Sequence, residues 1–218
     1  MRTRGVPLTV AVALCLALGS LPAHAASAVA LGPGSTLWLT GKSTLHDYES
    51  RANALTLTLV PDPGSRAPTD AASLESLIRS SHVHGIDVLV PVRSLHSPKK
   101  AIDKNLWSAL NADKHPNIRF RLSRYSLGST SGDTLGIHAE GRLEISGQEQ
   151  PEKLEVQLCR TDKGVWLEGS KALRMSEFGI RPPRMMMGTL RVADEIVVHY
   201  RLLLVPGGEA NALQVQPK

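Results

Sequence analysis

Apolar and polar residues alternate with a period of two along much of this chain. The alternation is clearest in 134–146, where Leu135, Ile137, Ala139, Leu143 and Ile145 alternate with residues that are polar apart from Gly136. The same pattern recurs at 55–59, 118–122, 154–158 and 196–204. A period of two predicts β-strands that turn one face toward a core. Further strands are expected at 36–45, 85–92, 165–173 and 185–190.

Two stretches depart from this alternation. Residues 97–112 carry apolar side chains at helical spacing, and Pro98 suits the first helical position after a Ser97 cap. Residues 61–81 are rich in proline and are expected to leave the sheet as a surface excursion with a short helix at 74–78. Eight or nine mostly antiparallel strands with one side helix indicate an all-β domain, either a closed barrel or a sandwich.

An eight-stranded barrel is either filled by side chains or holds one ligand. Aromatic residues make up only 4% of the chain, so few large rings are available to fill an interior. Periodicity alone leaves both alternatives open.

The two ends of the chain differ from its middle. Residues 1–25 have the basic, apolar and small-residue regions of a secretory signal peptide, and cleavage is expected before Ala26. Residues 26–35 are expected to form a flexible lead-in, 36–205 the barrel domain, and 206–218 a loose tail. Removing the signal also removes Cys15 and leaves only Cys159, so no internal disulfide is expected.

The formal charge of +5 falls to +3 when Arg2 and Arg4 are removed with the signal. The remaining basic residues are scattered, and nucleic-acid binding would need a denser patch with interleaved aromatics. Transient contact with an anionic membrane surface, and a homodimer formed through the outward-facing Cys159, stay open as alternatives.

No catalytic or metal site is predicted. Ser43 and His46 are three residues apart on a strand and so face opposite sides, which argues against a hydrolytic triad with Asp47. His82 and His84 share a strand face, but a metal site needs a third ligand, and we interpret both as structural.

The segment Met185–Met186–Met187 follows a Pro–Pro pair, and methionine suits adaptable apolar surfaces. We hypothesise that these methionines and Phe178 form part of a ligand mouth, the alternative being ordinary strand packing.

Several motifs, taken together and in order, resemble the YceI-like family of exported lipid-binding proteins across about 36–205. The segments that carry the resemblance are Gly41–Asp47, Asp103–Trp107, Ala112–Phe120, Gly141–Gly147, Met175–Pro183 and Gly188–Leu190. The chain departs from the family's central members in having Ser108–Ala109–Leu110 where those have paired phenylalanines, and in its long 61–81 excursion.

The resemblance implies an extended, antiparallel, lipocalin-like barrel of about eight strands that binds an isoprenoid or acyl lipid without catalysis and without a cofactor. The alternative is an exported structural or stress-related module with a filled barrel. The side chains expected to contact the lipid are Trp38, Leu57, Ile118, Phe120, Leu143, Trp166, Phe178, Met185, Met186 and Met187.

Overall fold

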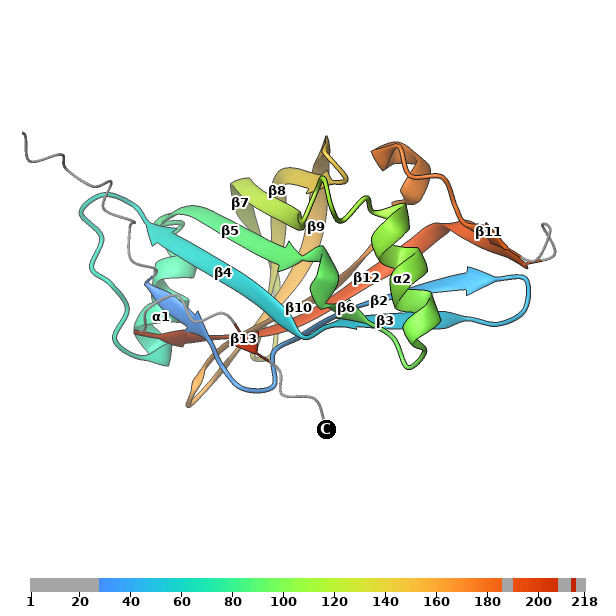
Figure 1. Cartoon of the computed structure of the whole chain (residues 1–218). Helices are drawn as coiled ribbons and strands as arrows, with labels where there is room; N and C mark the ends of the chain where they lie inside the picture. Colours follow the sequence, from blue (N-terminus) through green and yellow to red (C-terminus); the bar gives the residue numbers. More distant parts are fainter. Residues whose placement is uncertain (1–27, 186–189, 208–212, 215–218) are drawn as a thin grey trace, which may run out of the picture.

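The computed structural model describes residues 28–185, 190–207 and 213–214, which form thirteen strands and two α-helices (Figure 1). The helices are α1 (Ala71–Arg79) and α2 (Lys100–Ala109), and two short 3-10 helices are η1 (Val92–Ser94) and η2 (Met175–Phe178). The strands are β1 (Val29–Leu31), β2 (Thr36–Ser43), β3 (Tyr48–Ala52), β4 (Ala54–Pro61), β5 (Val83–Pro91), β6 (Leu95–His96), β7 (Asn117–Ser131), β8 (Thr134–Ile145), β9 (Gln148–Thr161), β10 (Gly164–Arg174), β11 (Arg184–Met185), β12 (Leu190–Pro206) and β13 (Leu213–Gln214).

All these strands pair antiparallel in one curled sheet. The strand order is β13-β4-β5-β7-β8-β9-β10-β12-β2-β3-β6, with β1 and β11 also paired to β12. Eight of the described strands are eight or more residues long: β2, β4, β5, β7, β8, β9, β10 and β12. The expectation of an all-β fold with about eight antiparallel strands is therefore confirmed.

The sheet curls back on itself where the chain turns a corner between β3 and β4. Only Asn53 separates β3, which pairs with β2, from β4, which pairs with β5, so the two edges of the sheet are joined through this bend. The short strand β1 adds a second link, since it pairs with β12 while Ala28 N donates a hydrogen bond of 3.2 Å to Leu59 O of β4. Register shifts in β7–β8 and β12–β2 add the local bending that closure requires.

Both ends of the described chain differ from the expected loose segments. The predicted lead-in at 26–35 contains β1, whose Val29 is fully buried, and the predicted tail contributes Pro206 to β12 and Leu213–Gln214 to β13. These residues become ordered because the edges of β4 and β12 offer backbone partners, which a local sequence pattern does not show. The expected signal segment at 1–25 lies outside the described residues.

The alternation in 134–146 orients β8 as expected. Leu135, Ile137, Ala139 and Ile145 are buried, whereas His138 and Arg142 of the same strand are exposed. The outer face carries cross-strand ion pairs, such as Asp87 with Arg119 and Glu140 with Lys153. The barrel therefore has an apolar interior and a charged exterior.

The helix α1 fills one end of the barrel, at the left of Figure 1. It begins at Ala71 because the Asp70 carboxylate accepts a 2.7 Å hydrogen bond from Ser73 N. Its apolar face contacts β9, β10 and β12, and Tyr125 Oη donates a 2.8 Å hydrogen bond to Ile78 O. The side chains at this end are almost fully buried: Val29, Leu59, Leu74, Leu135, Leu158, Val165 and Leu204.

The helix α2 lies over the opposite half of the barrel, and a buried carboxylate ties it to β6. The helix begins at Lys100, not at Pro98, so the predicted Ser97 cap is wrong: Ser97 Oγ bonds the backbone of Lys99, and no side chain caps the helix N-terminus. The Asp103 carboxylate instead accepts 2.6 Å and 3.2 Å hydrogen bonds from Ser97 N and His96 Nδ1.

Asp103 is only 4% exposed. Burial acts to raise the pKa of its carboxyl, but the hydrogen bonds from Ser97 and His96 outweigh burial, and the pKa lies below its ordinary value. A lowered pKa in the folded state means that the ionised carboxylate stabilises the fold at neutral pH. That contribution is complete above the pKa of the unfolded chain and is lost as the pH falls through the pKa of the folded protein.

We therefore expect Asp103→Asn to lower the free energy of unfolding by about 1–3 kcal/mol at pH 7, because the amide cannot accept both hydrogen bonds. Urea unfolding at pH 7 and below pH 3 would measure this, and the difference from the wild type should shrink at the lower pH. Asp113→Asn is the matched control, since Asp113 is 84% exposed in its ion pair with Arg93. An equal effect of the two changes would contradict the assignment.

Candidate functional site

The barrel encloses an apolar cavity of about 230 Å³ in the half covered by α2 and η2. Strands from all around the barrel contribute, α2 adds Leu106 and Ala109, and Leu110 follows directly after the helix. Residues at and just after η2 add Met175, Phe178 and Ile180. The strand residues that line the cavity are Leu37, Leu39, Tyr48, Leu57, Ile86, Val88, Val90, Leu95, Ile118, Phe120, Leu122, Ala139, Leu143, Ile145, Leu154, Val156, Leu167, Leu173, Arg174, Ile196, Val198, Tyr200 and Leu202.

The two halves of the barrel are packed differently. Leu158 and Leu204 in the α1 half have no exposed surface, whereas the inward-facing Leu154, Val156 and Leu143 in the cavity half are only half-buried. Protein interiors normally pack as densely as organic crystals, so unfilled space among aliphatic side chains is unusual. The interior is therefore solid at the α1 end and hollow at the α2 end.

Few polar atoms reach this interior. Tyr48 and Tyr200 line the cavity through their rings, and burial raises the pKa of both phenols, that of Tyr200 to about 12 with a further contribution from the nearby Glu155 carboxylate. Ser50, paired opposite Leu39 and so on the same inward face, is buried, and its Oγ bonds no described residue. The site can hold an apolar chain and offers at most a few hydrogen bonds.

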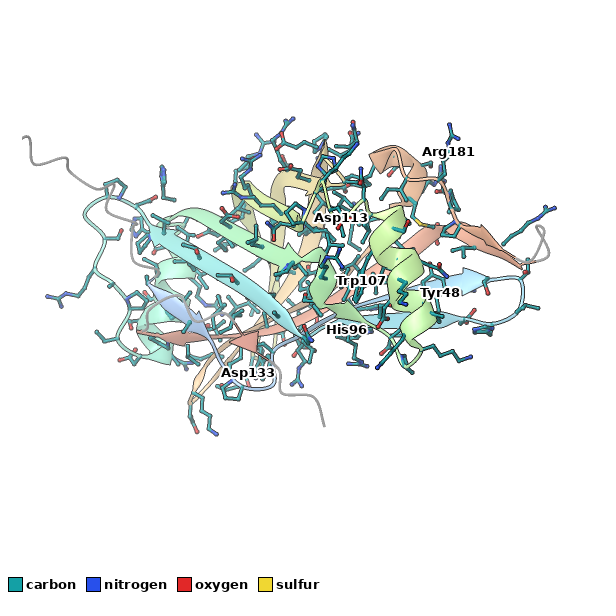
Figure 2. The ribbon with its side chains drawn as sticks, in the orientation of Figure 1. Tyr48, His96, Trp107, Asp113, Asp133 and Arg181 are labelled. Atoms are coloured by element: carbon teal, nitrogen blue, oxygen red, sulfur yellow. The ribbon has the colours of Figure 1, made fainter. Side chains whose placement is uncertain are left out.

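Five of the ten residues predicted to contact a lipid line this cavity. They come from strands β4, β7 and β8 and from η2: Leu57, Ile118, Phe120, Leu143 and Phe178. Figure 2 shows Trp107 on α2, with Tyr48 and His96 near this helix. Contact of these side chains with a bound lipid stays a prediction.

The expectation that Trp38 and Trp166 face the interior is wrong. Trp38 lies between the inward-facing Leu37 and Leu39, so its ring points outward and stacks on His199 at 5.0 Å. Trp166 carries the guanidinium of Arg201 at 4.2 Å from its ring centroid. Both tryptophans were expected to contact the lipid, but the strand alternation places both rings on the outer face.

The methionines expected at a ligand mouth lie at the limit of the described residues. Met185 belongs to β11, but its side chain, like Met186 and Met187, lies outside the described part of the molecule. Phe178 is 2% exposed and forms part of the cavity wall.

The sequence pattern identified Phe178 of η2 but did not identify the contribution of α2 or of the other residues at η2. Leu106 and Ala109 have the helical spacing noted for 97–112, but nothing local shows that this helix lies over the cavity. Arg174 is the one charged residue in the lining described, and it follows the last inward residue of β10. The position of Arg174 at the cavity depends on how β10 pairs with its neighbours, which a local sequence pattern does not show.

The structure does not bring the other candidate catalytic and metal-binding residues together into a site. Ser43 Oγ donates 2.7 Å to the backbone oxygen of His46, so the two residues form a turn contact. His84 Nδ1 lies 3.9 Å from an Asp62 oxygen, and no group of three potential metal ligands occurs among the residues described. Neither of the described helices is long and apolar enough to cross a bilayer.

Because the two halves of the barrel are packed differently, the same Leu→Ala change at two positions of β9 should lower the free energy of unfolding by different amounts. Leu158→Ala should lower the free energy of unfolding by about 3–5 kcal/mol, because it opens a void in a packed core. Leu154→Ala, four residues earlier on β9, should cost about 1–2 kcal/mol, because it enlarges space that already exists. Urea unfolding of both variants would test this, and equal losses would show that the cavity half is packed as well as the α1 half.

Comparisons with known proteins agree with this architecture. The YceI-like domain matches residues 40–204. A polyisoprenoid binding domain from Saccharophagus degradans, implicated in plant cell wall breakdown, superposes with a TM-score of 0.60 at 9% identity, over 83% of this chain and 99% of that one. BcnA of Burkholderia cenocepacia superposes with a TM-score of 0.59 at 15% identity, over 77% of this chain and 94% of that one.

A mutant YceI protein of Campylobacter jejuni with a monobromobimane guest superposes with a TM-score of 0.52 at 15% identity, over 73% of this chain and 85% of that one. No curated protein matches the chain. At these identities the structural likeness shows the fold, while the domain match spans most of the sequence. The chain belongs to the YceI-like family.

Proposed function

We propose that this protein binds the chain of a long amphiphilic lipid, isoprenoid or acyl, in the apolar cavity and carries or sequesters it without catalysis. The observation that supports this is the hollow half of the barrel, lined by aliphatic side chains around a volume of about 230 Å³. An apolar cavity of roughly 150 Å³ is already large enough to bind a small aromatic molecule. The similarity to a polyisoprenoid binding domain is consistent with such a ligand.

Burial of the lipid chain is the proposed source of affinity. At ~25 cal/mol per Å², a ligand that hides ~400 Å² of apolar surface gains ~10 kcal/mol before the entropy cost of association. Micromolar affinity corresponds to about 8 kcal/mol, so binding needs few polar contacts. The scarcity of polar atoms around the cavity fits this mechanism.

A substitution that fills the cavity tests the proposal. Val156 lines the cavity on β9, and Val156→Trp should weaken binding of a fluorescent long-chain probe about tenfold or more, since the ring takes the space of the chain. Gln157→Trp is the matched control, because Gln157 is the next residue and is exposed. Thermal unfolding would verify that both variants are folded.

Native mass spectrometry of the protein purified from its own host, followed by lipid extraction, tests the ligand directly. We expect a bound lipid whose mass is unchanged after prolonged incubation with the protein. A wild type that carries no lipid and takes up no probe would favour the structural or stress-related module instead. Retained affinity in Val156→Trp would place the ligand elsewhere.

We also infer that the chain is exported and acts in the periplasm or outside the cell, from the signal-like residues 1–25. Amino-terminal sequencing of the mature protein from its host should begin at Ala26, and a mature protein that retains residues 1–25 would contradict this inference. Contact with membrane surfaces and dimerisation through Cys159 remain predictions.

A further inference from the structure

The backbone ladder between β9 and β10 ends halfway along the two strands. It runs from Gly164 opposite Thr161 to Glu168 opposite Gln157. Both strands continue beyond this point, β9 back to Gln148 and β10 on to Arg174, but there β9 pairs only with β8 and β10 only with β12. The barrel wall therefore has a gap between β9 and β10, on the side of η2.

A groove of about 610 Å³ occupies this gap. It is lined by Gln150, Pro151, Glu152, Lys171, Ala172, Leu173, Arg174, Glu177 and Glu195. Leu173 and Arg174 also line the interior cavity. Leu173 is buried and faces inward, whereas Arg174 is exposed, so these two neighbouring residues separate the cavity from the groove.

Side chains hold the gap together where the ladder is missing. Lys171 Nζ lies 2.7 Å from Glu152 Oε2 and donates a 3.1 Å hydrogen bond to Lys153 O. Tyr200 Oη reaches from β12 past Gly169, where a side chain would collide with it, and donates 3.2 Å to Glu155 O. These bonds are fewer than a continuous ladder would supply, and each can break without unpairing a strand.

The groove carries both signs of charge. Lys171 is neutralised by Glu152, which is 10% exposed. Arg174 lies opposite Glu195 in the β10–β12 register, and Glu177 stands on η2 beside them. Three carboxylates and two cations give the groove a formal charge of about −1, which disfavours a strongly anionic group and suits a neutral or zwitterionic one.

We propose that the gap between β9 and β10 is the side mouth of the cavity, through which the lipid chain enters and leaves, and that it seats a neutral or zwitterionic head group. This proposal rests on the proposed lipid binding. The α1 end is filled by packed side chains, and α2 and η2 cover the other half, so the gap is where the apolar cavity meets a polar groove. The Lys171–Glu152 pair acts as its latch.

Removing the latch tests the route. The double change Lys171→Met and Glu152→Gln removes the ion pair without leaving a buried charge. It should raise the rates of uptake and release of a fluorescent long-chain probe by about tenfold each, with affinity changed less than about threefold, because the cavity lining is untouched. Stopped-flow fluorescence would measure both rates.

The matched control is the double change Arg201→Met and Glu168→Gln. This pair, at 2.8 Å, bridges β10 and β12 where their ladder is intact. Equal rates of probe uptake and release in the latch and control variants would contradict the proposal that the lipid enters between β9 and β10. A wild type that takes up no probe would instead refute the lipid binding on which the mouth depends.

Blocking the gap gives an independent test. Ala172 is exposed at the groove, so Ala172→Cys in a Cys159→Ser background can be labelled with a bulky maleimide. The label should slow uptake about tenfold. The same label on Gln157→Cys, where β9 and β10 are paired, should leave uptake unchanged. Unchanged uptake with both labels would overturn the proposed route.

Chain-matched ligands test the head group. Farnesol should bind at least about fivefold more tightly than farnesyl phosphate, since the phosphate would lie among carboxylates. The double change Glu177→Gln and Glu195→Gln should raise the affinity for farnesyl phosphate about fivefold and leave farnesol unchanged, whereas Glu168→Gln should alter neither. Tighter binding of farnesyl phosphate to the wild type would show that the mouth selects anionic heads.

Discussion

The apolar interior of this protein depends on one physical constraint. A β-sheet whose side chains alternate between its two faces curls onto itself and encloses one of those faces. Once β3 and β4 turn the corner at Asn53, every second side chain on each long strand must face a shared interior. Burial of these aliphatic side chains is the main favourable contribution to folding. The same curling leaves only short strands, β13 and β6, at the two ends of the strand order, which limits the unpaired backbone that the sheet presents at its edges.

The volume that the strands enclose is larger than their inward side chains can fill. In one half of the barrel a helix fills the remaining space, and in the other half it stays empty. At one end α1 inserts Leu74 against Leu158 and Leu204, and the packing there is complete. At the other end α2 and η2 cover the barrel while leaving about 230 Å³ unfilled. A large void among apolar side chains lowers the free energy of unfolding. The tight packing around α1 offsets this cost of the cavity.

The barrel wall at β9 and β10 also differs between the two halves of the molecule. Near the α1 end the two strands share a regular ladder, and beyond Glu168 a few side chains take its place. Local stability in proteins is set by such differences in packing and hydrogen bonding, and regions that must open are drawn from the less stable part. The unfilled cavity and the interrupted ladder occupy the same half of the molecule.

Much of this architecture follows from local pattern. The alternation at Leu135, Ile137 and Ile145 specifies strands with one buried face, and the proline-rich 61–81 segment leaves the sheet as its composition predicts. The same rule places Trp38 on the outer face beside the inward-facing Leu37, although Trp38 was predicted to contact the lipid. Alternation assigns residues to faces because the side-chain period of a strand is fixed by its backbone geometry.

By itself, then, the sequence determined most of the long strands, the inward face of most of them and the family to which the chain belongs. Only the tertiary structure decided whether the interior is hollow, which helix covers which half, and where β9 and β10 separate. Those properties depend on the balance between enclosed volume and side-chain volume, and on pairings between residues far apart in the chain. Neither quantity is a function of any local stretch of residues.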